Sequence, residues 1–170
     1  DSDIKDISIE SNHSHCEDAL NIVRSKGSIN KLNLQNSQFD LVDFDFSDIK
    51  INKAVLSNSK NDCLDFSYGN YFIEEITTSN CEDKALSVGE KSMLKVNNFK
   101  GFQNNLDIAI KDSSQIELNN FSSDKKKNQN CISIYKKKQE FDGGTLSLIK
   151  KKFECVVNKD LYSKVVLNAK

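Results

Sequence analysis

The chain has 170 residues with a formal net charge of −1, and it contains neither proline nor tryptophan. This length is enough for one domain with a sizeable core. No run of about 18 apolar residues occurs, which argues against a membrane-spanning helix.

The five cysteines form no CxxC pair, which argues against a zinc ribbon or a thioredoxin-like site. Their odd number also argues against a complete disulfide framework. We therefore expect them to be buried free thiols that fill small apolar spaces. They are Cys16, Cys63, Cys81, Cys131 and Cys155.

Charge is distributed unevenly along the chain. Residues 1–85 carry 8 basic and 16 acidic side chains, whereas residues 86–170 carry 16 basic and 9 acidic ones. Three lysine runs, Lys125–Lys127, Lys136–Lys138 and Lys150–Lys152, lie near the C-terminal end, where we expect charge to prevent edge-to-edge strand pairing. Aromatic residues do not alternate with these lysines, so nucleic acid is not an expected partner.

The N-terminal ten residues form an acidic, alternating stretch without the features of a signal peptide. We expect the chain to be a fragment of a longer protein with other domains. His13 and His15 follow in a polar segment, where solvent-exposed histidines are the expectation.

Residues 38–102 contain an internal repeat. Segments 38–59 and 60–81 match position by position over 22 residues, and segment 82–102 follows the same plan with a slip of one residue. Apolar residues alternate with period 2 in short runs, which predicts strands and no helices. Two columns of apolar residues recur at this spacing. The first is Leu20, Val42, Leu64, Leu86, Ile108 and Ile132. The second is Ile4, Ile29, Ile51, Ile73, Val96 and Leu118, closing at Leu146.

This repeat predicts an all-β fold, a right-handed single-stranded parallel β-helix of six to seven coils with ~22 residues per coil. A propeller blade needs roughly 40 residues, and a sandwich would not keep constant columns. Regular coils are expected over residues 11–149, and a C-terminal cap over residues 150–170 that includes a strand at Lys164–Leu167. Each column then stacks at ~4.8 Å per coil.

A polar column supports the same register. Asn36, Asn58 and Asn80 recur at 22 residues. Stacked asparagines hydrogen-bond to one another along a ladder, so we expect such a ladder at one turn of the coil.

Acidic residues occupy outward positions of the first strand in the N-terminal coils. Asp43 and Asp65 are separated by one coil, about 5 Å. The acidic set is Asp18, Asp40, Asp43, Asp45, Asp62 and Asp65. Carboxylates at that distance repel one another, and three ways of relieving this repulsion are open. Ca²⁺ bridges Asp43 and Asp65; one carboxyl keeps a raised pKa and acts as a general acid; or Asp40 and Asp62 cap turns.

The basic residues near this face are Arg24, Lys84 and Lys111. Asp43 and Asp65 with Arg24 or Lys84 are the candidate catalytic residues. The charge reverses at the third coil, so a site is expected at that reversal. The candidate ligand-binding residues are Asp40, Asp43, Asp45, Asp62, Asp65, Lys84 and Glu90.

Two segments carry a resemblance to a known superfamily. NDCLDFSYGN (61–70) and EDKALSVGEKS (82–92) resemble coils of the pectate-lyase-like right-handed parallel β-helix proteins, in particular an uncharacterised bacterial branch. The resemblance covers residues 11–149 and implies a carbohydrate context outside the cell or at its surface. The NTD, DD, GHG and RIK set of polygalacturonases and the DPHE motif of epimerases are absent, so no catalytic residue is transferred.

Together these features predict a non-catalytic, carbohydrate-associated module that binds polysaccharide along its acidic first-strand face. One alternative is a polysaccharide lyase, epimerase or hydrolase. Another is a structural spacer or protein-interaction scaffold.

Overall fold

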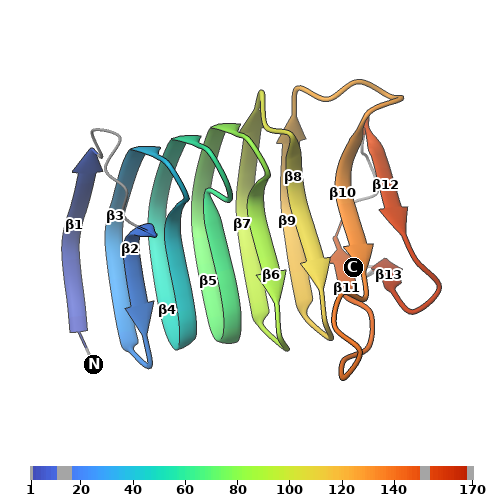
Figure 1. Ribbon diagram of the computed structural model, residues 1–170, viewed down its shortest axis with the longest axis horizontal. Coiled ribbons are helices and arrows are strands. Elements are labelled where there is room, and N and C mark those ends of the chain that lie inside the picture. Colours follow the sequence, from blue (N-terminus) through green and yellow to red (C-terminus); the bar gives the residue numbers. More distant parts are fainter. Residues whose placement is uncertain (1, 11–16, 150–153, 168–170) are drawn as a thin grey trace.

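The computed structural model describes residues 2–10, 17–149 and 154–167. This part of the chain contains thirteen strands and no helix, and every pair of neighbouring strands is parallel. The strands wind into a β-solenoid of about seven turns, with the N-terminal coils at one end and the C-terminal strands at the other (Figure 1). The predicted all-β parallel coil is therefore confirmed.

Two stacks of strands run along the solenoid. The first-strand stack contains β2 (Asp18–Val23), β6 (Lys84–Gly89), β8 (Leu106–Lys111), β10 (Asn130–Tyr135) and β12 (Val156–Lys159). The second contains β1 (Ser2–Glu10), β3 (Lys26–Ser37), β7 (Met93–Phe102), β9 (Gln115–Ser123), β11 (Thr145–Leu148) and β13 (Lys164–Leu167). The long strands β4 (Asp40–Ser59) and β5 (Leu64–Cys81) bend at the corners and belong to both stacks.

The strand register confirms the apolar columns. Leu20 pairs with Val42, and Val42 with Leu64, while Ile4 pairs with Ile29. One assignment was wrong. The column of Leu118 closes at Leu148, not at Leu146, because Leu146 pairs with Ile116. The two leucines differ by two residues and face the same side of the strand, so the alternation could not distinguish them.

The column residues form one continuous core. Phe44 and Phe66 are fully buried with ring centroids 5.7 Å apart, and Tyr71 lies 4.5 Å from Phe66. Each fully buried apolar side chain stabilises the fold by about 1.5–3 kcal/mol. The coils are therefore held together mainly by apolar side chains at equivalent positions of successive coils, which pack on one another.

The corners of the coil require a left-handed backbone conformation. Asn36, Asn58, Asn80 and Gln103 have φ values of 66°, 59°, 54° and 52°. Asparagine tolerates this region better than most residues, which explains its recurrence. At another corner Gly69 has φ 116°, and a Cβ there would lie 2.1 Å from the carbonyl oxygen of Ser47.

The expectation of free thiols was wrong for four of the five cysteines. Cys63 and Cys81 form one disulfide, with Cα atoms 5.6 Å apart, and Cys131 and Cys155 form another, with Cα atoms 5.8 Å apart. The two pairs are separated by 18 and 24 residues in sequence, so only the stacking of consecutive coils brings them within bonding distance. Cys16 lies outside the described residues.

The C-terminal region continues the stack. β12 pairs with β10 and β13 pairs with β11, so the predicted strand at Lys164–Leu167 is confirmed and a second strand accompanies it. His13, His15 and Lys150–Lys152 lie outside the described residues. In the described ranges, no helix has the length and apolarity needed to cross a membrane.

Candidate functional site

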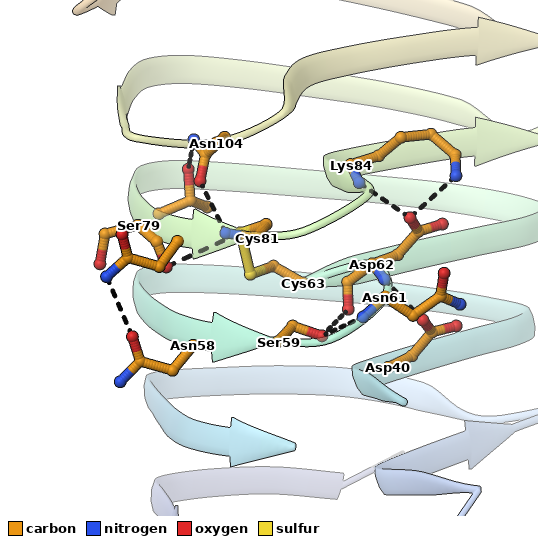
Figure 2. Close-up of a disulfide and its surroundings, with 12 residues drawn as sticks. Asp40, Asn58, Ser59, Asn61, Asp62, Cys63, Ser79, Cys81, Lys84 and Asn104 are labelled. Atoms are coloured by element: carbon orange, nitrogen blue, oxygen red, sulfur yellow. Dashed lines mark hydrogen bonds and ion pairs between the residues drawn. A yellow bond between two sulfur atoms is a disulfide. The ribbon is translucent and has the colours of Figure 1, made fainter. Parts of the chain in front are cut away.

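Two polar surfaces lie on either side of the turn that joins the second stack to the first. One is the first-strand face, defined as the outward side chains of the first-strand stack. The other is a groove along the column of Asn36, Asn58 and Asn80, which we call the amide groove. The Cys63–Cys81 disulfide lies between the two surfaces (Figure 2).

The first-strand face brings most of the predicted acidic residues together. Asp43 and Asp65 are register partners on β4 and β5. Oxygen atoms of Asp40, Asp62 and Asp65 lie within 4.8 Å of one another. Oxygen ligands of this kind suit a hard cation such as Ca²⁺, so these three residues, rather than Asp43 with Asp65 alone, are the geometric candidates for a cation site.

Asp40 and Asp62 also cap turns. Asp40 Oδ1 accepts a hydrogen bond from the Asp62 backbone N–H at 2.8 Å. Asp62 Oδ1 accepts from both the backbone N–H and the ammonium of Lys84, at 3.0 and 2.9 Å (Figure 2). Of the three predicted ways of relieving the carboxylate repulsion, turn capping by Asp40 and Asp62 is therefore present.

Burial raises the pKa of the Asp40 and Asp43 carboxyl groups. The pKa of Asp40 rises to about 7, chiefly because burial disfavours the charged form, with added repulsion from Asp62 and Asp65. The pKa of Asp43 also rises to about 7, through burial and the charges of Asp45 and Asp65. These two groups are thus partly protonated near neutral pH, as a proton donor would need to be.

Two lysines from later coils compensate the acidic cluster. The Lys84 ammonium contacts Asp62 and Asp83, which holds its pKa above its ordinary value although burial lowers it. The Lys111 side chain crosses Gly89, where a Cβ would lie 3.0 Å from its Cε, and its ammonium is 4.0 Å from Asp65. The absence of a side chain at residue 89 therefore makes room for a cation that reaches back two coils.

Lys111 belongs to a part of the face that is closed to solvent. Ser87 is the register partner of Asp65 but is fully buried. Among the described residues, its hydroxyl has no hydrogen-bond partner. Ala109, the next residue of this column, is also fully buried, so the face is closed at β6 and β8 and open at the coils that carry aspartates.

Two other predicted site residues, Arg24 and Glu90, lie near Asp45, whose pKa is raised by burial and by the charge of Glu90 and lowered by that of Arg24. The Arg24 guanidinium sits 5.3 Å from the ring of Phe46, which stacks on Tyr68 at 4.6 Å. Glu90 accepts from the Ser67 hydroxyl at 2.7 Å and pairs with Lys138 at 2.5 Å. Burial raises the pKa of Glu90, but these two partners outweigh it and lower the pKa below its ordinary value.

The amide groove is a cavity of about 900 Å³, which is in the size range of ligand sites. It crosses successive coils and is lined almost entirely by polar side chains. The lining residues are Asn36, Ser37, Gln38, Asn58, Lys60, Asn80, Cys81, Glu82, Gln103, Asn104, Asn105 and Lys125.

A hydrogen-bonded ladder runs along this groove. Asn58 donates through Nδ2 to Asn36 Oδ1 at 3.0 Å, and Asn80 donates to Asn58 Oδ1 at 3.0 Å. The predicted ladder is confirmed, and it lies on the outer surface, where Asn58 and Asn80 are exposed. Gln103 continues the same left-handed corner.

The groove could not be predicted from the sequence, because the residues that line it form no motif. Lys60 pairs with Glu82, and the Lys125 ammonium donates to the Asn105 carbonyl oxygen at 3.1 Å. The 22-residue spacing of Asn36, Asn58 and Asn80 was the available signal. It indicated a ladder but not the concave surface beside it.

Comparison of this chain with protein-family models, with curated proteins and with solved structures found no match.

Proposed function

We propose that this protein is a binding module for an extended neutral polysaccharide, held in the amide groove. The observation that carries the proposal is the Asn36–Asn58–Asn80 ladder along a cavity of about 900 Å³. This keeps the carbohydrate context predicted from the sequence and from the pectate-lyase-like resemblance, but it moves the site from the acidic face to the groove.

The chemistry of the ladder favours hydroxyl groups. A side-chain amide has two N–H donors and two acceptor lone pairs, and a rung inside the ladder uses one of each. Asn58 thus keeps one donor and one acceptor for a ligand. A hydroxyl both donates and accepts, so a chain of sugar hydroxyls satisfies each rung.

Charge favours a neutral polymer over a uronate. Lys60 is paired with Glu82, which leaves Lys125 as the remaining cation of the lining. The neighbouring face carries aspartates, which repel an anionic chain. Phe39 and Phe102 adjoin the lining residues Gln38 and Gln103 in sequence and are 48% and 45% exposed, so apolar ring faces are available near both ends of the groove.

The two disulfides support an extracellular or cell-surface location, because disulfides persist in oxidising compartments. The fold resemblance implies the same location.

The test is binding to a panel of soluble β-glucan, mannan and dextran, with polygalacturonate as the anionic comparator, measured by affinity electrophoresis and calorimetry. The double variant Asn58→Gly/Asn80→Gly removes two rungs and keeps the left-handed backbone permissible. We expect it to lose at least about tenfold in affinity for the bound neutral glycan.

The matched control is Asn52→Ala. Asn52 donates to Asn30 Oδ1 at 3.0 Å, an amide pair of the same kind outside the groove lining, so its loss should leave affinity unchanged. Undiminished binding by the ladder variant, or equally tight binding of polygalacturonate, would contradict the proposal. Release of unsaturated or reducing ends from any polymer would favour the enzymatic alternative.

A second candidate is cation binding by Asp40, Asp62 and Asp65, favoured by their oxygen atoms lying within 4.8 Å of one another. If Ca²⁺ binds there, millimolar Ca²⁺ should raise the melting temperature of the wild type and have no effect on Asp65→Asn. An equal response of both proteins would refute this site.

A further inference from the structure

The residue directly after each ladder asparagine makes contacts that hold the next turn in shape, and we call these contacts a brace. Ser37 Oγ accepts from the Phe39 backbone N–H at 3.2 Å and donates to the Asp40 carbonyl oxygen at 3.0 Å. Each asparagine rung of these coils is therefore followed by a turn whose shape a serine hydroxyl holds.

The next coil repeats this arrangement. Ser59 Oγ accepts from the Asn61 backbone N–H at 3.3 Å and lies 2.9 Å from the Asp62 carbonyl oxygen (Figure 2). It also lies 2.7 Å from the Phe39 carbonyl oxygen of the preceding coil. Ser37 and Ser59 are register partners and are buried. The hydroxyl brace is thus a repeated feature of the coil, like the ladder beside it.

The third coil has no hydroxyl at this position. Cys81 is the register partner of Ser59 and directly follows the rung Asn80. Its sulfur is bonded to Cys63, which directly follows Asp62 in the preceding coil, and both cysteines are fully buried. The turn after Asn80 is therefore bonded covalently to the preceding coil, whereas the Ser59 hydroxyl reaches its own preceding coil only through a hydrogen bond. The Cys81 backbone N–H also donates to Asn104 Oδ1 at 3.2 Å.

We infer that the Cys63–Cys81 disulfide is a positioning element of the amide groove, replacing the serine brace and holding the Asn80 rung at hydrogen-bonding distance from Asn58. This inference deepens the proposed function and rests on it for its effect on ligand affinity. Its structural consequence, the order of the Asn80 rung, stands without a ligand.

A rescue series separates this role from general stabilisation. Cys63→Ala/Cys81→Ala removes both the disulfide and any brace. Cys63→Ala/Cys81→Ser removes the disulfide but restores the hydroxyl found in the two preceding coils. Cys131→Ala/Cys155→Ala is the matched control, because it removes a disulfide whose cysteines are not in the groove lining.

The first readout is solvent exchange of the Asn58 and Asn80 side-chain amide protons by NMR, which needs no ligand. We expect about tenfold faster exchange in Cys63→Ala/Cys81→Ala, because a loosened turn opens locally, and wild-type exchange in the serine variant and in the control. Unchanged exchange in the double-alanine variant, or failure of serine to restore it, would overturn the inference.

The second readout is affinity for the β-glucan, mannan or dextran that the wild type binds. We expect about a tenfold loss in the double-alanine variant, recovery to within about twofold with Cys81→Ser, and no loss in the control, although all three variants lose thermal stability. An equal loss of affinity in the control would show general destabilisation instead. If the wild type binds none of these glycans, the proposed function fails while the exchange experiment still decides the positioning role.

Discussion

The amide groove and the acidic part of the first-strand face are built in the same way, by stacking one residue type on itself at 22-residue spacing. In the groove, Asn58 donates to Asn36 and accepts from Asn80, so each added coil gains a bond. On the first-strand face, Asp43 stacks on Asp65, and each added coil adds repulsion.

The difference follows from the side chains. An amide carries donor and acceptor together, whereas an ionised carboxylate only accepts. Asparagine columns therefore satisfy themselves, while aspartate columns need protons, backbone N–H groups or lysines from later coils. Periodic stacking amplifies either consequence, which explains why two surfaces of the same solenoid differ so strongly.

The largest effect should come from removing the cation that makes the acidic column tolerable. Lys84→Met leaves Asp62 buried without its ammonium partner; the side chains are 12% and 5% exposed. We expect a loss of about 3–5 kcal/mol in the free energy of unfolding at pH 7, measured by urea denaturation. Adding Asp62→Asn should recover part of it, and a loss below about 1 kcal/mol would show that Asp62 does not depend on Lys84.

Asn58→Asp replaces one amide of the ladder with a carboxylate, the group that is stacked on the first-strand face. The carboxylate cannot donate to Asn36 Oδ1, so we expect a loss of about 1–3 kcal/mol in unfolding free energy at pH 7. At pH 3 a protonated carboxyl donates again, and the loss should shrink. A penalty that is independent of pH would contradict the contrast between amide and carboxylate.

Asp43→Asn makes the reverse change. The pKa of Asp43 is raised from 3.8 to about 7 in the folded protein, so between these values the folded state binds more protons than the unfolded state. Its contribution to stability is complete below about pH 4 and is lost as pH rises to about 7.

Wild-type unfolding free energy should therefore fall between pH 4 and 7 through Asp43 and Asp40. Because these carboxyl groups remain partly solvated, we expect Asp43→Asn to stabilise the protein by about 1–2 kcal/mol at pH 8 and to flatten this slope. Stability of the wild type that rises over the same interval would contradict the raised pKa values.

The smallest effect should come from the rim of the groove. The pair Lys60–Glu82 is exposed, with side chains 53% and 56% accessible, so Lys60→Ala should change the unfolding free energy by less than about 0.5 kcal/mol. The same variant should bind neutral glycans nearly as well as the wild type, since the ladder is intact. A large loss of affinity would assign binding to charge instead of amides.

The sequence by itself determined the columns. A 22-residue period with alternating apolar residues specifies the register, the parallel stacking and the asparagine ladder, because each coil must bury the same positions against its neighbours. It also placed Asp43 beside Asp65, since strand alternation decides which side chains share a face.

Only the tertiary structure determined which residues of different columns contact one another. The pairing of Cys63 with Cys81 and the reach of Lys111 to Asp65 join positions that are not register partners. Ser87 is fully buried although it is the register partner of Asp65. The groove likewise arises from the left-handed corners at Asn58 and Asn80. A period describes contacts between equivalent residues of successive coils, whereas these features depend on how a coil bends and on side chains that cross from one column to another.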